Sequence, residues 1–115
     1  MDIFEKLTGG PAPVLILTPD GQRIDAAAAI AFKDRMRQLT ATGPDRVVLD
    51  LSAVQFLDSS GLGAIVASLK QMRDGQTLEL AGARDMVAKV LNLTRMDKVF
   101  RIHDSADFLD GGMPV

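Results

Sequence analysis

The sequence has no cysteine, no tryptophan and no tyrosine among its 115 residues. Without cysteine, disulfides and thiolate metal sites are excluded, and the composition suits the reducing cytoplasm. All five aromatic residues are phenylalanine, which leaves no platform of rings on which nucleic-acid bases could stack. The net charge of -2 gives nucleic acid no electrostatic attraction either, so we expect no nucleic-acid partner.

Long apolar runs are absent too. None reaches the roughly 18 residues that a membrane span requires, and the N-terminal residues MDIFEKLTGG lack the basic start and apolar core of a secretory signal. We therefore expect a cytoplasmic protein with no membrane span. The hydrophobic content of 47% and the charged content of 24% are typical of a soluble globular protein. A chain of this length can bury one core, so residues 1–115 should form a single domain.

A strand followed by a helix is predicted within the stretch Val47–Met72. The apolar run Val47–Leu51 predicts a strand that is buried on both faces. Asp58, Ser59 and Ser60 come next, and all three residue types favour helix N-caps over helix interiors. Beyond them the apolar residues recur at helical spacing, at Leu62, Ile65, Val66, Leu69 and Met72. The helix should therefore begin at the two serines.

A helix that begins at the serines has two properties that matter for function. Its unpaired backbone amides and the positive end of its dipole lie next to the serine hydroxyls. Gly61 and Gly63 also keep the first turn slim, so that another backbone or a large ligand can approach it closely. The segment Asp58–Gly61 is therefore the candidate functional segment.

The remaining elements are predicted from apolar periodicity and from turn residues. Asp25 is expected to cap the first helix, which should bury Phe32 and Met36. The turn Gly9–Pro11 should join the first two strands as a hairpin. The order β-β-α-β-α-β-α-β-α predicts an α/β fold with a mixed sheet. Strands are expected at Ile3–Leu7, Val14–Leu17, Thr77–Leu80 and Val99–Ile102, and further helices over Met86–Leu91 and after Ser105, with Phe108 and Leu109 in the last.

Four interpretations of Asp58–Gly61 follow from the residues alone. A catalytic serine needs a base and an oxyanion hole, but the elbow pattern G-x-S-x-G is absent and His103 is the only histidine. A phosphate-binding loop is disfavoured because there is no Walker lysine, and because Val66 stands where a dinucleotide fingerprint requires glycine or alanine. The third interpretation is that these residues cap a helix and do nothing more. The fourth makes a serine the substrate of a protein kinase.

Phosphorylation at this position would change binding more than folding. It adds about -1.5 to -2 charges and a bulky acceptor group. The helix dipole tolerates a phosphate at the N-terminus, so the fold should survive. A partner that packs against a neutral hydroxyl would then meet both charge and bulk, beside the existing charge of Asp58.

The chain resembles the STAS domains (sulphate transporter and anti-sigma factor antagonist), and in particular the small bacterial anti-sigma factor antagonists. The resemblance is centred on VVLDLSAVQFLDSSGLGAIVASLK, where an apolar strand precedes Asp-Ser-Ser-Gly-Leu-Gly and an amphipathic helix. It implies a single STAS domain over residues 1–115, with a mixed sheet of four or five strands and about four helices mainly on one face.

The resemblance also implies a function. In this family the unphosphorylated antagonist binds an anti-sigma factor that is itself a serine kinase, and so frees a sigma factor. Phosphorylation ends the binding, and a PP2C-type phosphatase reverses it. The family's acceptor position falls on Ser59, with Ser60 as the second choice. The partner-binding positions fall on Asp25, Asp58, Ser59, Ser60, Gly61 and Leu62. We expect no enzymatic activity, no cofactor and no metal.

Two other functions are weighed against this one. In the first, the chain is a structural STAS subunit of a larger assembly, such as a lipid transporter or a stress-sensing complex, and Ser59 is never phosphorylated. The intact sequence Asp58–Ser60 favours the switch. A small hydrolase or nucleotide-binding enzyme is disfavoured by the missing base, lysine and glycine. Of the remaining polar residues, Asp50 is expected to be structural, His103 an exposed loop residue, and the basic segment Arg84–Arg101 a solvated face.

Overall fold

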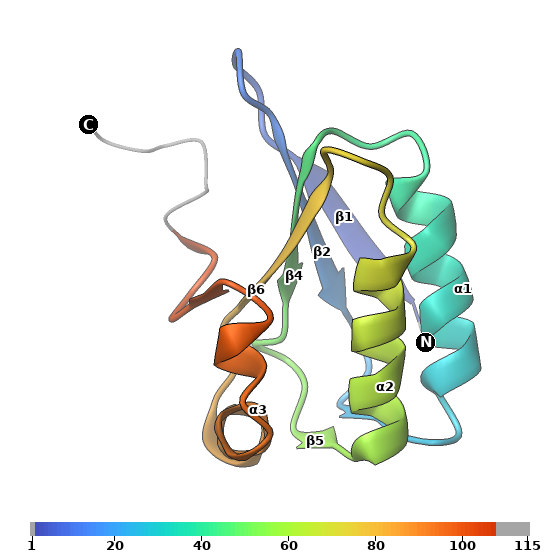
Figure 1. Cartoon of the computed structure of the whole chain (residues 1–115), viewed down its shortest axis with the longest axis vertical. Helices are drawn as coiled ribbons and strands as arrows, with labels where there is room; N and C mark the ends of the chain where they lie inside the picture. Colours follow the sequence, from blue (N-terminus) through green and yellow to red (C-terminus); the bar gives the residue numbers. More distant parts are fainter. Residues whose placement is uncertain (1, 108–115) are drawn as a thin grey trace.

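The computed structural model describes residues 2–107 of the chain, and Figure 1 shows their arrangement. The strands of the main sheet are β1 (Ile3–Leu7), β2 (Val14–Pro19), β4 (Arg46–Asp50), β6 (Thr77–Ala81) and β7 (Ile102–His103). They lie in the order β1-β2-β4-β6-β7. The pair β1–β2 is antiparallel, and the other three pairs are parallel. The α/β fold with a mixed sheet that the sequence predicts is therefore confirmed.

Two helices cover one face of this sheet. They are α1 (Ala29–Thr40) and α2 (Ser59–Lys70), which lie side by side in Figure 1. A third helix, α3 (Asp85–Leu93), packs against the same core through Val87 and is followed by the 3-10 helix η1 (Met96–Lys98). No helix within residues 2–107 is long and apolar enough to cross a membrane.

The core lies between the sheet and the helices, because alternate residues of a strand face the same side. Phe32 and Met36 of α1 and Ile65 of α2 are fully buried there, which confirms the apolar stripe expected on the first helix. The strand residues on this side are Leu15, Leu17, Val47, Leu49, Leu78 and Leu80. A smaller apolar cluster on the other face of the sheet consists of Val14, Ile16, Val48 and Ala81.

Two short strands form a second sheet that the sequence analysis does not predict. The strand β3 (Arg23–Ile24) pairs in parallel with β5 (Phe56–Leu57), so that Ile24 lies opposite Leu57. Because β3 precedes α1 and β5 precedes α2, this pairing brings the starts of the two helices together. The small sheet therefore positions the candidate site.

Three predicted boundaries need comment. The helix α1 begins at Ala29 rather than directly after Asp25, because residues 26–28 form a turn. The last strand begins at Ile102 rather than at Val99, which follows η1 and is 49% exposed. The expected final helix was to carry Phe108 and Leu109, and those two positions lie outside the described residues.

His103 is not the exposed loop residue expected from the sequence. It lies on β7, its side chain is 20% exposed, and its Nε2 is 2.7 Å from Oε1 of Glu79. The Arg46 guanidinium donates two hydrogen bonds to the same carboxylate, at 2.7 and 2.9 Å. Burial pushes the pKa of Glu79 upward, but the hydrogen bonds from Arg46 and His103 outweigh burial and hold that pKa below its ordinary value. The cluster ties β4, β6 and β7 together.

Candidate functional site

The start of α2 is capped by Asp58 rather than by a serine. Asp58 has extended backbone angles, and its Oδ1 accepts a hydrogen bond of 2.9 Å from the amide of Gly61. Its backbone carbonyl accepts the first helical bond, from the amide of Leu62. Ser59 and Ser60 are therefore the first two residues of the helix. Of the three cap-forming residues in the sequence, the aspartate takes the position, which leaves both serine side chains without that task.

The second carboxylate oxygen of Asp58 reaches the segment that leads into α1. Its Oδ2 accepts a hydrogen bond of 3.2 Å from the amide of Ala26. Asp25 accepts hydrogen bonds of 3.1 and 3.2 Å from the amides of Ala27 and Ala28, so it caps the turn that precedes α1. Asp25 and Asp58 each directly follow one member of the pair Ile24–Leu57, at the ends of β3 and β5. The structure thus places the two acidic residues at neighbouring strand ends.

Gly61 allows this part of the chain to close up. A Cβ atom added at Gly61 would lie 1.8 Å from the carbonyl oxygen of Ile24, so only glycine fits there. A Cβ atom added at Gly63 would meet no atom within 4 Å. Two glycines were expected to keep the first turn slim, and the described fold requires only Gly61. The segment that approaches closely at Gly61 is the backbone of β3.

The side chains of both serines are accessible from solvent. Ser59 and Ser60 are exposed, and neither hydroxyl forms a hydrogen bond with any residue that the structure describes. Their backbone amides belong to the unpaired set at the start of α2. Leu62 is half-buried and packs against the core, so it supports the site from below. The predicted residues Asp25 and Asp58–Leu62 are therefore brought together.

The local charge is negative and held in place. Arg23 donates a hydrogen bond of 3.2 Å to Oδ2 of Asp25, and this bond, assisted by the amides of the following turn, lowers the pKa of Asp25 against the opposing effect of burial. The guanidinium of Arg23 also lies 4.0 Å from the ring centre of Phe56 on the paired strand. The Asp25 carboxyl group is therefore ionised at neutral pH, beside the carboxylate of Asp58.

Arg23 and Phe56 are site-supporting residues that the sequence analysis missed. Their contact depends on the pairing of β3 with β5, and each of these strands has two residues. Two residues are too few for an alternation of apolar and polar positions to be recognised. The cation–π contact joins residues 33 positions apart, and the sequence contains no signal for it.

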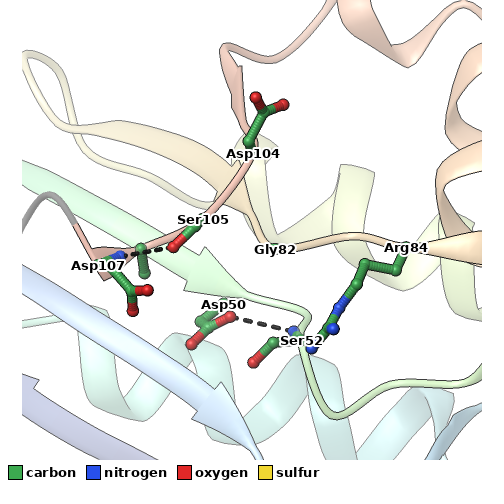
Figure 2. A pocket seen from close by; sticks show the side chains of 8 residues that line it. Asp50, Ser52, Gly82, Arg84, Asp104, Ser105 and Asp107 are labelled. Atoms are coloured by element: carbon green, nitrogen blue, oxygen red, sulfur yellow. Dashed lines mark hydrogen bonds between the residues drawn. The ribbon is translucent and has the colours of Figure 1, made fainter.

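A separate cavity of about 370 Å³ lies at the carboxyl ends of β4 and β6 (Figure 2). Asp50 ends β4 there, and its Oδ1 accepts a hydrogen bond of 3.0 Å from the amide of Ser52, as expected of a structural strand-end residue. Arg84 extends toward Ser52, whereas Asp104 points away from Asp50 (Figure 2). The residues that line the cavity include no paired nucleophile and base, and residues 2–107 contain no cluster of three or more metal-binding side chains. This cavity therefore does not indicate an active site.

Comparison with known proteins places this geometry in context. The STAS domain family profile matches residues 7–108. The chain is 29% identical over 96 residues to the anti-sigma-F factor antagonist RsfB of Mycobacterium tuberculosis, a match that covers 80% of this chain and 79% of RsfB. It is 27% identical over 89 residues to the anti-sigma-B factor antagonist of Listeria monocytogenes, covering 76% of this chain and 78% of that protein. The crystal structure of an anti-sigma factor antagonist from Mycobacterium paratuberculosis superposes with a TM-score of 0.75 at 27% identity and covers 92% of this chain and 89% of that chain. The names of these relatives describe regulatory binding proteins rather than enzymes.

Proposed function

This chain belongs to the STAS domain family, and on that premise we propose that it is an anti-sigma factor antagonist switched by phosphorylation at Ser59. Its unphosphorylated form binds an anti-sigma factor that is itself a serine kinase, which frees a sigma factor. The kinase phosphorylates Ser59 with ATP, and the antagonist then dissociates. A PP2C-type phosphatase removes the phosphate. The protein is a binding module in this cycle, and the catalysis belongs to its partners.

The observation that carries this proposal is that the Ser59 hydroxyl is exposed and has no hydrogen-bond partner among the described residues. Ser59 is exposed and forms no side-chain hydrogen bond with the described residues, whereas the side chain of the preceding Asp58 accepts two. Asp58 already caps the helix, so the fold of residues 2–107 does not use the Ser59 hydroxyl. A kinase can therefore take up Ser59 without breaking a structural contact.

The charge around Ser59 supports a switch in binding. A phosphate there adds about -1.5 to -2 charges next to the carboxylates of Asp58 and Asp25. Two unpaired amides and the helix dipole stabilise the phosphate within the chain. A partner surface that fits a neutral hydroxyl would have to bury this charge. A penalty of about 3 kcal/mol at the interface corresponds to a loss of more than a hundredfold in affinity.

The test begins with the serine-kinase anti-sigma factors that the source genome encodes. Each purified kinase is incubated with this protein and ATP, and the product is digested and mapped by mass spectrometry. We expect one kinase to add one phosphate, at Ser59. The control variants are Ser59→Ala, which should receive no phosphate, and Ser60→Ala, which should still receive its one phosphate at Ser59. A phosphate at Ser60 would contradict the assignment, and no phosphate with any kinase would favour the structural-subunit alternative.

A further inference from the structure

We propose that the groove between the start of α1 and the face of α2 that runs from Ser60 to Ala67 receives an aliphatic side chain of the anti-sigma kinase, and that Lys33 pairs with a carboxylate on the same kinase segment. This inference rests on the proposed function, because it names where the kinase docks beside the phosphorylation segment. The occupant is one segment of the kinase that presents both chemical groups.

The groove begins at the phosphorylation segment. It has a volume of about 150 Å³, and Ser60 forms one end of its lining. Gly63, Ala64 and Ala67 continue from Ser60 along one face of α2, since residues three and four apart are neighbours on a helix. Ala29, Ile30 and Lys33 form the facing wall on α1. A cavity of about this volume is large enough to hold a benzene molecule, and hence one side chain. A kinase that binds at Ser59 would therefore lie next to this groove.

Gly63 has no role within the described fold that explains it. Glycine in a helix interior is less favourable than alanine. Gly61 has a reason for its lack of a side chain, which is the carbonyl of Ile24, but a Cβ atom at Gly63 would meet nothing within 4 Å. The open space beside Gly63 is the groove itself. The close approach that Gly63 permits is therefore the approach of a partner, not of this chain.

The side chains at the rim of the groove indicate which chemical groups a partner would place there. Ile30 is 71% exposed, although it lies on the first turn of a helix whose other large apolar residues face the core. Burying such a side chain against an aliphatic group is favourable. Lys33 forms no ion pair or hydrogen bond with residues 2–107, whereas Arg23, Arg46 and Arg73 each pair with a carboxylate. A partner segment that carries an aliphatic group and a carboxylate complements this rim.

The test uses the kinase that phosphorylates wild-type protein, titrated calorimetrically without ATP. Gly63→Leu fills the groove, and Gly63→Ala adds a single Cβ in case the larger residue disturbs the fold. Both should melt no lower than wild type, and Gly63→Leu should weaken kinase binding by at least about tenfold. Ile30→Ala and Lys33→Glu should weaken it as well. The matched controls are Gly9→Leu, at a glycine where an added Cβ also meets nothing within 4 Å, and Leu93→Ala, which removes an apolar side chain that is likewise 71% exposed.

The outcomes separate this inference from the proposed function. If a kinase phosphorylates Ser59 but binds the groove variants as tightly as wild type, the groove is not its docking site and the switch stands. If no kinase binds wild type at all, both proposals are wrong. If Ile30→Ala instead dissolves a homodimer of the free protein, a second copy occupies the groove and the kinase assignment is overturned. Weakened binding in the groove variants, with both controls unchanged, supports the inference.

Discussion

The two glycines in the first turn of α2 should respond in opposite ways to the same substitution. Gly61 and Gly63 lie two positions apart in one helix, so Gly→Ala has the same intrinsic effect on helix formation at both. The surroundings differ, because an added Cβ lies 1.8 Å from the Ile24 carbonyl oxygen at position 61 and meets nothing within 4 Å at position 63. Any difference in stability between the two variants therefore measures how closely α2 approaches β3.

The expected difference is large compared with the stability of a small protein. Alanine in place of glycine stabilises a helix by about 1 kcal/mol, and that gain should appear in full for Gly63→Ala. At Gly61 the new methyl group must displace a backbone carbonyl rather than a flexible side chain. Overpacking of this kind costs roughly 1–3 kcal/mol and occasionally more, and contact with backbone favours the upper end. Gly61→Ala should therefore lower the free energy of unfolding by about 2 kcal/mol, some 3 kcal/mol below Gly63→Ala.

The assay is urea denaturation of both variants beside wild type, followed by circular dichroism, with thermal melts as a second measurement. A difference of about 3 kcal/mol corresponds to roughly 10 °C or more in Tm for a chain of this size. A slope against urea that matches wild type would show that the loss lies in the native state. Equal stability of Gly61→Ala and Gly63→Ala would refute the close contact between α2 and β3 on which the site geometry depends.

Two further predictions concern carboxylates. Asp58→Ala removes the acceptor for the amides of Gly61 and Ala26, so it should lower the free energy of unfolding by about 1–2 kcal/mol. Asp58→Asn should recover most of this loss, because asparagine is also a good cap. Urea denaturation measures both variants, and an Asp58→Ala variant as stable as wild type would contradict the capping role. Glu79 has a pKa below its ordinary value of 4.5, because its hydrogen bonds with Arg46 and His103 outweigh burial, so its contribution to stability is present above that pH and is lost as the pH falls through the folded pKa. Glu79→Gln should therefore lower the free energy of unfolding by about 1.5–3 kcal/mol at neutral pH, and the variant should lose less stability in acid than wild type. Urea denaturation at neutral and acid pH measures both effects. A loss of stability in acid as steep as that of wild type would show that other carboxylates cause it.

Long periodic segments could be predicted from the sequence, and short pairings could not. The apolar run before Asp50 and the helical spacing from Leu62 onward each contain enough residues to define a period, and both elements form as expected. The strands β3 and β5 have two residues each, and their pairing depends on contacts between distant parts of the chain. The arrangement of Asp25 beside Asp58 follows from that pairing, so the residue types at the site could be predicted but their contacts could not.

The boundaries show the same limit. Residue preference allowed any of Asp58, Ser59 and Ser60 to cap α2, and the tertiary contact from Asp58 to the amide of Ala26 favours the aspartate. His103 looked like a lone polar residue in a loop, but β7 pairs with β6 and places it against Glu79. In both cases the deciding partner lies more than 20 positions away in the sequence, where local patterns carry no information.

The central claim is that a negative charge at Ser59 stops binding without unfolding the protein. The measurement is calorimetric titration of the cognate anti-sigma kinase with wild type, Ser59→Ala and Ser59→Asp, after each protein has been melted alone. Because Asp58 supplies the helix cap, all three should melt within a few degrees of one another. Ser59→Ala should bind as tightly as wild type, and Ser59→Asp should bind more than about a hundredfold more weakly. A folded Ser59→Asp that binds the kinase with wild-type affinity would contradict the account.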